Sequence, residues 1–432
     1  MADIRAFRGL RYDLAKTGSL ADLIAPPYDV IDEGLSQRLH AANDHNVIRL
    51  ILNPTKPEDT DTDNRYTRAS KTLRHWRESG ALAEEAEPCV YAYFQEFTWE
   101  GVTYNRRGFM VRVRLEPFGE GKIYPHEETM PGPKADRLKL FHATGMNLSQ
   151  IFGLYPDADN EVANSIEEAV RGKTPLEAVD HLGVTHRLWT VTDPETVSKI
   201  QGLMGPKPIF IADGHHRYET SCKHLEEREA AGKVTGPEDP SCFTLMMLVG
   251  MDDPGLKVMP THRLVSGLPG ITSAQLQDRL GEVFKIEAIG SGEEKARQAC
   301  EAVESSDRQD MMAFGTTSDQ EWFVATLKDP KAMDAAVSDH SEVWKSLGVS
   351  ILHRLALGKC LEGMGTPSCT YVHLVDEVLE SMAAKSCDLC CIVQPATVEH
   401  IRALASKFEK MPPKSTYFYP KLASGLVFNP IH

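Results

Sequence analysis

The sequence predicts a mixed fold of the α/β to α+β class, for two reasons. Short apolar runs, such as residues 151–155 and 243–249, have the length and composition of buried strands. Other segments repeat apolar residues at helical spacing, as residues 64–79 do with Leu73 and Trp76 on one face. Strands that alternate with helices along a chain are typical of α/β and α+β architectures.

The other predicted elements divide the chain into three parts. The N-terminal α/β part, residues 1–117, contains predicted strands at residues 4–10 and 47–52 and a hairpin of residues 89–98 and 104–115. The middle part, residues 118–268, contains a predicted helix from about Ala135, a helix at 160–171, and strands at 187–191, 209–212 and 260–265. The C-terminal α/β part, residues 269–432, contains predicted helices at 275–283, 293–304 and 397–409 and strands at 311–315, 321–326 and 389–394.

Composition predicts a cytoplasmic protein without nucleic-acid or membrane partners. The 432 residues are 41% hydrophobic and 25% charged, which is ordinary for a globular protein. The formal net charge of −15 disfavours nucleic-acid binding, because phosphate contacts need a basic surface. No signal peptide or membrane-spanning run is apparent, and nine cysteines without a secretion signal predict reduced thiols. Cys387, Cys390 and Cys391 have apolar neighbours and are expected in the core rather than on a metal.

The stretch from Ile209 to Thr220 is the leading candidate for a functional site. Its apolar start predicts a short buried strand, and the pentapeptide Asp213–Arg217 (DGHHR) separates this strand from a helical pattern. A helix N-terminus presents unpaired N–H groups and the positive end of the helix dipole, which suits an anion such as phosphate. Capping needs only Asp213, so the two histidines and the arginine favour a functional turn.

Two further segments concentrate polar side chains. The first lies between apolar strands and carries His126, Glu127, Thr129, Lys134, Asp136, Arg137, Asn147 and Ser149. The second lies near the C-terminus and carries Lys414, Ser415, Thr416, Tyr417, Tyr419 and Lys421. Smaller candidates are Tyr28 with Asp29, and His262 with Arg263. The alternatives are a solvated loop before a capped helix, a surface hairpin, and a structural His-Arg pair on a strand.

These residue types are the ones that phosphoryl transfer needs. The reaction requires cations or a metal to hold the donor phosphates and a carboxylate to take the proton of the acceptor hydroxyl. Asp213 can hold Mg²⁺, and His215, His216 and Arg217 can donate to phosphate oxygens. Glu127 is the best candidate for the general base. Neither a Walker A sequence nor a Gly-x-Gly-x-x-Gly loop occurs, which excludes both standard nucleotide cradles.

Five further motifs accompany the DGHHR turn in a fixed order: residues 25–30 (APPYDV), 125–129 (PHE-x-T), 134–138 (KADRL), 147–149 (N-x-S) and 413–421 (PKSTYFYPK). With residues 211–220 (IADGHHRYET), they resemble a widespread prokaryotic family catalogued as a domain of unknown function. The turn and the Pro125-His126-Glu127 motif also resemble those of the free serine kinases of the ParB/sulfiredoxin-like superfamily.

This resemblance implies a ParB/sulfiredoxin-like core at residues 118–268, flanked by the additional N-terminal and C-terminal parts. It implies an Mg²⁺-dependent kinase that phosphorylates free L-serine to O-phospho-L-serine, with pyrophosphate, ADP or ATP as donor. Glu127 takes the role of catalytic base, and Asp213, His215, His216 and Arg217 contact the phosphate and the metal. The sequence departs from the small kinases by an insertion between Pro125 and Asp213 and by the segment 414–421, and both departures leave the donor open.

The expected site therefore has three groups of residues. Catalysis is assigned to Glu127, Asp213, His215 and His216, with Asp213 also as the metal ligand. Donor binding is assigned to His126, Thr129, Lys134, Arg137, Arg217, Lys414, Ser415, Thr416 and Lys421. Substrate binding is assigned to Tyr28, Asp29, Asn147, Ser149, His262 and Arg263. The alternatives are a ParB-like nucleotide- or DNA-binding protein, which the net charge disfavours, and a non-catalytic small-molecule-binding protein, which Glu127 disfavours.

Overall fold

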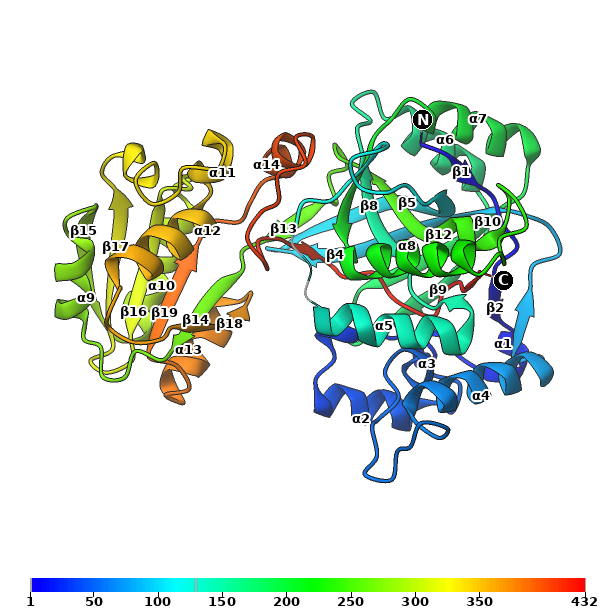
Figure 1. The fold of residues 1–432 in the computed structure, drawn as a ribbon, viewed down its shortest axis with the longest axis horizontal. Helices are drawn as coiled ribbons and strands as arrows, with labels where there is room; N and C mark the ends of the chain where they lie inside the picture. The colour runs from blue at the N-terminus through cyan, green and yellow to red at the C-terminus, as the bar shows by residue number, and fades with distance from the viewer. Residues whose placement is uncertain (1, 128, 130, 432) are drawn as a thin grey trace. The chain divides into compact units, whose positions relative to one another are not determined.

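The chain folds into two compact units, shown in Figure 1. The computed structural model describes residues 2–127, 129 and 131–431. Unit 1 comprises Met1–Pro125, Thr129–Lys257 and Pro420–His432, and unit 2 comprises His126–Glu128 and Val258–Tyr419. Each unit has its own large sheet and its own apolar core, so each is described by itself.

Unit 1 is built on a mixed sheet that has nine strands among the described residues. Its order is β6 (Ile123–Tyr124), β11 (Ile209–Asp213), β8 (Ile151–Tyr155), β12 (Phe243–Gly250), β5 (Val102–Arg114), β4 (Val90–Trp99), β10 (Thr185–Val191) and β9 (Leu176–Val179), with β1 (Ile4–Arg5) also on β5. Strand β11 is parallel to β6 and antiparallel to β8, and β12 is parallel to β8. The remaining ladders of this sheet are antiparallel.

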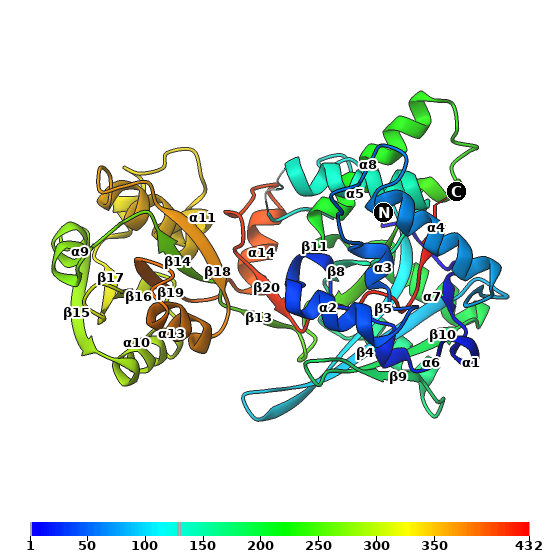
Figure 2. The same ribbon diagram turned by 90° about the horizontal axis from the view of Figure 1, so that it is seen from below.

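Helices and short segments surround this sheet in both views (Figures 1 and 2). The helices are α1 (Leu14–Thr17), α2 (Glu33–Ala42), α3 (Ile48–Ile51), α4 (Arg65–Glu78), α5 (Pro131–Thr144), α6 (Glu161–Val170), α7 (Pro194–Met204) and α8 (His215–Ala230). The shorter elements are β2 (Leu10–Tyr12), β3 (Leu82–Glu84), β7 (Met146–Asn147), β21 (Asn429–Pro430) and the 3-10 turns Leu20–Asp22, Tyr28–Val30 and Pro240–Cys242.

The two faces of the sheet in unit 1 are covered differently. Alternate strand residues such as Val111, Ile151 and Leu248 form one apolar cluster with Val162 and Ile166 of α6. Complete burial of each such side chain contributes about 1.5–3 kcal/mol to folding. Side chains of the opposite parity meet the C-terminal segment, residues 420–431, which therefore lies over the other face.

Unit 2 contains a six-stranded antiparallel sheet among its described residues. Its order is β15 (Phe284–Ser291), β17 (Glu321–Leu327), β16 (Met311–Thr316), β19 (Leu389–Val393), β14 (His262–Ser266) and β18 (Ser368–Val372). The other elements are α9 (Ser273–Leu280), α10 (Glu293–Glu304), α11 (Glu342–Ser346), α12 (Gly348–Ser350), the π-helix Ile351–Cys360, α13 (Val375–Ala383), α14 (Val398–Ala405), the 3-10 turn Pro330–Met333, β13 (Lys257–Met259) and β20 (Tyr417–Tyr419). Apolar residues of α10 and α13 pack on this sheet.

The predicted α/β to α+β class is confirmed, and one predicted strand is wrong. Residues 47–52 contain a short helix, α3, rather than a strand. The side chain of Asn46 accepts a hydrogen bond from the N–H of Ile48, the first residue of this helix. A short apolar run of this kind cannot be distinguished from a buried strand by periodicity. Helix α5 begins at Pro131, earlier than predicted, because proline is tolerated in a first helical turn.

The predicted division at residues 117 and 268 stays a prediction of domain organisation. The boundaries of the two compact units differ from this division. Strands β4 and β5 of the predicted N-terminal part share a sheet with β8, β11 and β12 of the predicted middle part. The nine cysteines are free thiols, and Cys387, Cys390 and Cys391 are buried as predicted. Within the described residues, no helix combines the length and apolar character needed to cross a bilayer.

Candidate functional site

The turn between β11 and α8 depends on the glycine at its centre. Gly214 precedes the helix with φ of 94° and ψ of 28°, in the left-handed region that favours glycine. A Cβ atom at this position would lie 2.8–2.9 Å from the guanidinium atoms of Arg217. The absence of a side chain therefore lets Arg217 fold back over the turn toward the strand end.

Replacing Gly214 by alanine should destabilise unit 1 and displace Arg217. The positive φ alone costs about 1–2 kcal/mol for an L-residue, and the contact with the guanidinium adds to this. The free energy of unfolding from urea titration measures the loss. Gly202→Ala is the matched control, because an added Cβ meets nothing within 4 Å and alanine favours a helix. Equal stability of the two variants would contradict the role of Gly214.

Asp213 at the end of β11 is bound by two cations. Its Oδ2 accepts a hydrogen bond of 2.5 Å from Nη2 of Arg217, and its Oδ1 accepts one of 2.9 Å from Nζ of Lys421. Burial alone would raise the pKa of Asp213, but Lys421 and Arg217 hold it well below its usual range. The carboxylate is therefore ionised, and one negative and two positive charges leave the cluster with a net positive charge.

The backbone places both cations. Nη1 of Arg217 also donates to the carbonyl oxygen of Gln150, just before β8. The carbonyl of Lys421 accepts a hydrogen bond of 3.0 Å from Nε2 of Gln95, and the buried Arg106 donates to the carbonyl of Pro420. The sheet thereby fixes the C-terminal segment so that the Lys421 ammonium, 12% exposed, reaches Asp213.

The two histidines occupy the first turn of α8. His215 is buried and close enough to Asp213 to stabilise its carboxylate, and His216 is half-buried. The first four N–H groups of a helix have no partner within the helix, and the dipole adds about half a positive charge there. An anion that contacts this turn would meet these N–H groups as well as Arg217 and Lys421.

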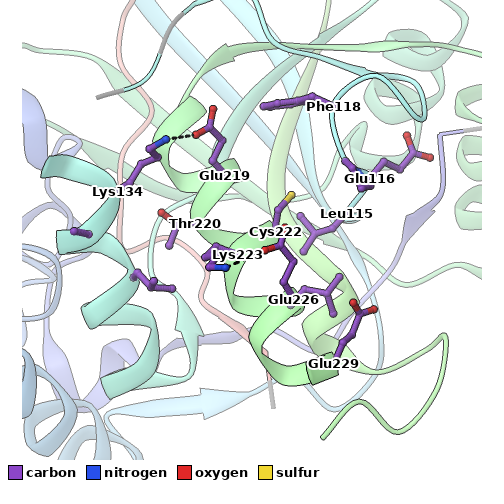
Figure 3. A pocket seen from close by; sticks show the side chains of 14 residues that line it. Leu115, Glu116, Phe118, Lys134, Glu219, Thr220, Cys222, Lys223, Glu226 and Glu229 are labelled. Carbon is purple, nitrogen blue, oxygen red and sulfur yellow. Dashed lines mark hydrogen bonds and ion pairs between the residues drawn. The ribbon is translucent and has the colours of Figure 1, made fainter. Parts of the chain in front are cut away.

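Thr129 and Lys134 converge on an acidic residue that the sequence did not single out. Thr129 Oγ1 and Lys134 Nζ each lie 2.8 Å from Oε2 of Glu219, on the second turn of α8. Lys134 and Glu219 also line a cavity of about 650 Å³ beside α5 and α8, shown in Figure 3. Its lining includes apolar side chains such as Leu115 and Phe118 and the glutamates Glu116, Glu219, Glu226 and Glu229.

Arg137 belongs to a second ion-pair network in unit 1. Its Nη1 donates to the carbonyl of Ile51 at 2.9 Å, and its Nε donates to Oδ2 of Asp136 at 2.7 Å. The guanidinium lies 3.9 Å from the ring centroid of Tyr28. Burial is the main cause of the raised pKa of Tyr28, and Arg217 and Asp213 also influence it. Tyr28 and Arg137 thus lie in the neighbourhood of the DGHHR turn.

The other candidates of unit 1 have different surroundings. The Oδ1 of Asn147 accepts hydrogen bonds from the N–H of Leu245 and from Nδ2 of Asn429, at 3.1 and 2.6 Å. Ser149 Oγ lies 2.7 Å from Oγ of Ser424. Both residues thereby fasten the C-terminal segment, while Asp29 is exposed.

In unit 2, Glu127 and His126 hold the segment that begins at Lys414. Oε1 of Glu127 accepts a hydrogen bond from the N–H of Lys414, whose φ is 59°. Nε2 of the buried His126 lies 2.9 Å from Oγ1 of Thr416. Ser415 is buried and donates to the carbonyl of Pro412 at 2.5 Å. His126 and Glu127 therefore contact residues 414–416 within this unit.

The His-Arg pair on β14 is completely buried. Arg263 donates through Nε to His353 at 3.1 Å, through Nη2 to the carbonyl of Lys414 at 3.0 Å, and through Nη1 to the carbonyl of Thr261. The charge of Glu127 also influences Arg263. Arg263 thereby binds the backbone of the Lys414 segment, a contact that its neighbours in the sequence do not indicate.

His262 should make unit 2 sensitive to acid. Burial and the neighbouring Arg263 and His373 lower the pKa of His262 to about 3. In the unfolded chain histidine titrates near about 6.5, so below that pH the unfolded state binds more protons and stability falls as pH drops. Urea titrations at about pH 7.5 and about pH 5 measure the free energy of unfolding. Between these two pH values it should fall more for the wild type than for His262→Gln. The exposed His181→Gln variant should behave like the wild type, and identical slopes for all three would contradict this account.

A cavity in unit 2 that is lined partly by Arg354 and Lys410 has no counterpart among the predicted site residues. This cavity of about 330 Å³ is lined by His340, Trp344, His353, Arg354, Tyr371, Lys410 and residues 411–413. It adjoins the Lys414 segment along the chain and includes the Arg263 partner His353. Its two cations, Arg354 and Lys410, and its two histidines come from separate stretches of sequence, so no local motif could indicate it.

The candidate residues thus form two groups, one in each unit. In unit 1, an ionised carboxylate, two cations and a helix N-terminus form an anion-attracting turn that also offers carboxylate oxygen to a metal. In unit 2, Glu127, the Lys414 backbone and a buried arginine form a separate hydrogen-bonded group. Chemically, the first group can hold phosphate, and the second contains the carboxylate proposed as a base.

Comparisons with known proteins give one family and several remote structures. The family described as "Protein of unknown function (DUF1015)" matches residues 4–350. No curated protein matches the sequence. Similar solved structures are a free serine kinase variant in complex with AMP, a conserved hypothetical protein from Pyrococcus furiosus and C-terminally truncated SbnI from Staphylococcus aureus. Their identities are 15%, 15% and 11%, with TM-scores of 0.34, 0.33 and 0.34. In the same order, the similar regions cover 69%, 70% and 74% of this chain and 84%, 89% and 86% of the chains in the solved structures.

Proposed function

This chain belongs to the DUF1015 family, and we propose that it is a cytoplasmic kinase that phosphorylates free L-serine to O-phospho-L-serine. The observation that carries the proposal is the ionised Asp213, bonded to Arg217 and Lys421 at the N-terminus of α8. The order of motifs from residues 25–30 to 413–421 supports the same assignment. The proposal includes a ParB/sulfiredoxin-like core at residues 118–268.

The donor phosphate is proposed to bind at the DGHHR turn. Arg217 and Lys421 provide charge-assisted hydrogen bonds, and the N–H groups of His215 and His216 face the same end of the helix. Cations fixed before the reaction stabilise the charge that develops on the transferring group without further reorganisation. Thr129, Lys134 and Arg137 are proposed to contribute to the same donor site.

Asp213 fits a magnesium ion that is held mainly by the donor. Mg²⁺ is usually bound by one or two carboxylates together with substrate phosphates. Each carboxylate oxygen has more than one lone-pair site, so the bonds to Arg217 and Lys421 leave coordination capacity at Asp213. When bound, the ion would neutralise charge on the donor phosphates.

Glu127 is proposed as the general base. Its carboxylate takes the proton of the serine hydroxyl as the Oγ atom attacks the terminal phosphorus of the donor. The bond from phosphorus to the leaving oxygen breaks, which gives O-phosphoserine and, from pyrophosphate, orthophosphate. The hydrogen bond from the N–H of Lys414 orients Glu127, and Arg263 donates a hydrogen bond to the Lys414 carbonyl.

Pyrophosphate is the preferred donor in this proposal, with ADP and ATP as the alternatives. The chain lacks both standard nucleotide cradles, and residues 414–421 add two lysines and two hydroxyls to an otherwise acidic protein. These features suit a small, highly charged donor better than one that needs an adenine pocket.

The experiment is incubation of the purified protein with L-serine, Mg²⁺ and each donor in turn, followed by ³¹P NMR. Phosphoserine is expected with at least one donor, at the highest rate with pyrophosphate. Omission of Mg²⁺ should remove the signal. Absence of phosphoserine with pyrophosphate, ADP and ATP would refute the kinase assignment. Salt-sensitive DNA binding in the same preparation would favour the ParB-like alternative.

A further inference from the structure

Helices α5 and α8 carry a second cluster of metal-binding residue types, away from the DGHHR turn. His142 lies in the last turn of α5, and His224 and Glu227 lie on α8. One ligand atom from each of the three side chains lies within 4.8 Å of those of the other two. We propose that these residues form a binding site for a divalent transition metal, with Zn²⁺ as the preferred ion.

The donor set suits zinc and not magnesium. Two imidazoles and one carboxylate are the protein ligands of well-known His₂Glu zinc sites, with a fourth position for water. Magnesium instead prefers oxygen ligands in octahedral geometry. The cluster is therefore chemically distinct from the proposed Mg²⁺ ligand Asp213 and does not depend on the proposed function.

The distances between the three side chains are close to those expected around a bound zinc ion. Nε2 of His142 lies 2.9 Å from Oε2 of Glu227. The rings of His142 and His224 have centroids 5.3 Å apart at an interplanar angle of 58°. Two imidazoles on one tetrahedral zinc, with Zn–N distances of about 2.0–2.1 Å, would have centroids about 5 Å apart. Small side-chain rotations could thus bring the three ligand atoms onto one ion.

Helix spacing and exposure also favour binding. His224 and Glu227 are three residues apart on α8, so they share one face of the helix, as Glu-x-x-His pairs do in metal-binding bundles. His224 is buried, whereas His142 and Glu227 have side chains that are 47% and 38% exposed. The buried ligand provides a fixed anchor, and the two exposed ligands leave an entry path from solvent.

A metal at this position would clamp α5 to α8. The two helices pack side by side in unit 1 (Figures 1 and 2). His224 lies nine residues beyond His215, which is about 13 Å along the helix axis at 1.5 Å per residue. The ion would therefore act on the packing of the helix that begins at the DGHHR turn, and would have no direct contact with that turn.

The test is zinc titration of the chelator-treated full-length protein by isothermal calorimetry, with Co²⁺ absorption as a report of coordination geometry. One Zn²⁺ per chain is expected, with a tetrahedral Co²⁺ spectrum and a higher Tm in zinc. His142→Ala and Glu227→Gln should each weaken zinc binding at least about 100-fold, since loss of even an outer-shell partner costs about 10–100-fold.

The exposed His75→Ala variant on α4 is the matched control and should bind zinc as the wild type does. Both test positions are partly exposed, so circular dichroism should show folded variants. Millimolar or absent zinc binding by the wild type would overturn the site. Undiminished binding by His142→Ala and Glu227→Gln would overturn it as well, because the ion would then lie elsewhere.

Discussion

Replacement of Asp213 by asparagine is expected to lower kcat/KM at least about 10²–10³-fold, the range seen when one preorganised electrostatic group is removed from an active site. The amide cannot balance the charges of Arg217 and Lys421, and it is a poor Mg²⁺ ligand. The rate of phosphoserine formation, followed by ³¹P NMR, measures this effect.

The same variant should be less stable by about 1–3 kcal/mol, because one of two largely buried cations loses its acceptor and both lose the neutralising charge. Asp252→Asn in an exposed turn is the matched control and should change neither activity nor the urea midpoint. Turnover within about twofold of the wild type would remove Asp213 from the proposed mechanism, even if stability fell.

Replacement of Glu127 by glutamine is expected to lower kcat at least about 10²-fold, the usual contribution of a general base. Glutamine retains a side-chain oxygen that can accept the hydrogen bond from the N–H of Lys414. The variant therefore tests the proton-accepting role with little disturbance of the segment. Initial rates of phosphoserine formation at saturating serine and saturating donor measure kcat directly.

Glu127→Asp should recover part of the activity, because it restores a carboxylate at a shorter reach. The exposed Glu195→Gln variant on α7 controls for loss of a negative charge. If Glu127→Gln turned over at the wild-type rate, the base would have to be another group. If both Glu127 variants were equally inactive but unfolded, the residue would be structural.

The sequence predicted an element most accurately where apolar residues repeat at a regular spacing within one continuous stretch. Helix α10 occupies residues 293–304 as predicted, because its apolar residues repeat at helical spacing between charged ones. Strand β8 occupies residues 151–155 as predicted. A short apolar run such as residues 47–52 carries no period, so the sequence does not distinguish a strand from the helical turn that the structure has there.

The sequence indicated many of the residues in the candidate site, but it did not indicate which of them contact one another. The sequence indicated Asp213 and Lys421 separately, yet 208 residues separate them and only the paired strands and the C-terminal segment bring them together. Glu219 lies inside the motif of residues 211–220, but the sequence does not indicate its role, because its partners Thr129 and Lys134 come from another part of the chain. The ligands His142, His224 and Glu227 were missed because they lie on two helices and match no linear zinc motif.

We propose that this protein transfers a phosphoryl group to serine rather than hydrolysing the donor. The most direct measurement is a ³¹P NMR time course of the wild type and Asp213→Asn with L-serine, Mg²⁺ and pyrophosphate. For the wild type, the concentrations of phosphoserine and orthophosphate should rise one for one as pyrophosphate falls. For the variant, both changes should be far slower. Pyrophosphate that stays intact with every preparation, or that yields orthophosphate without phosphoserine, would contradict the account.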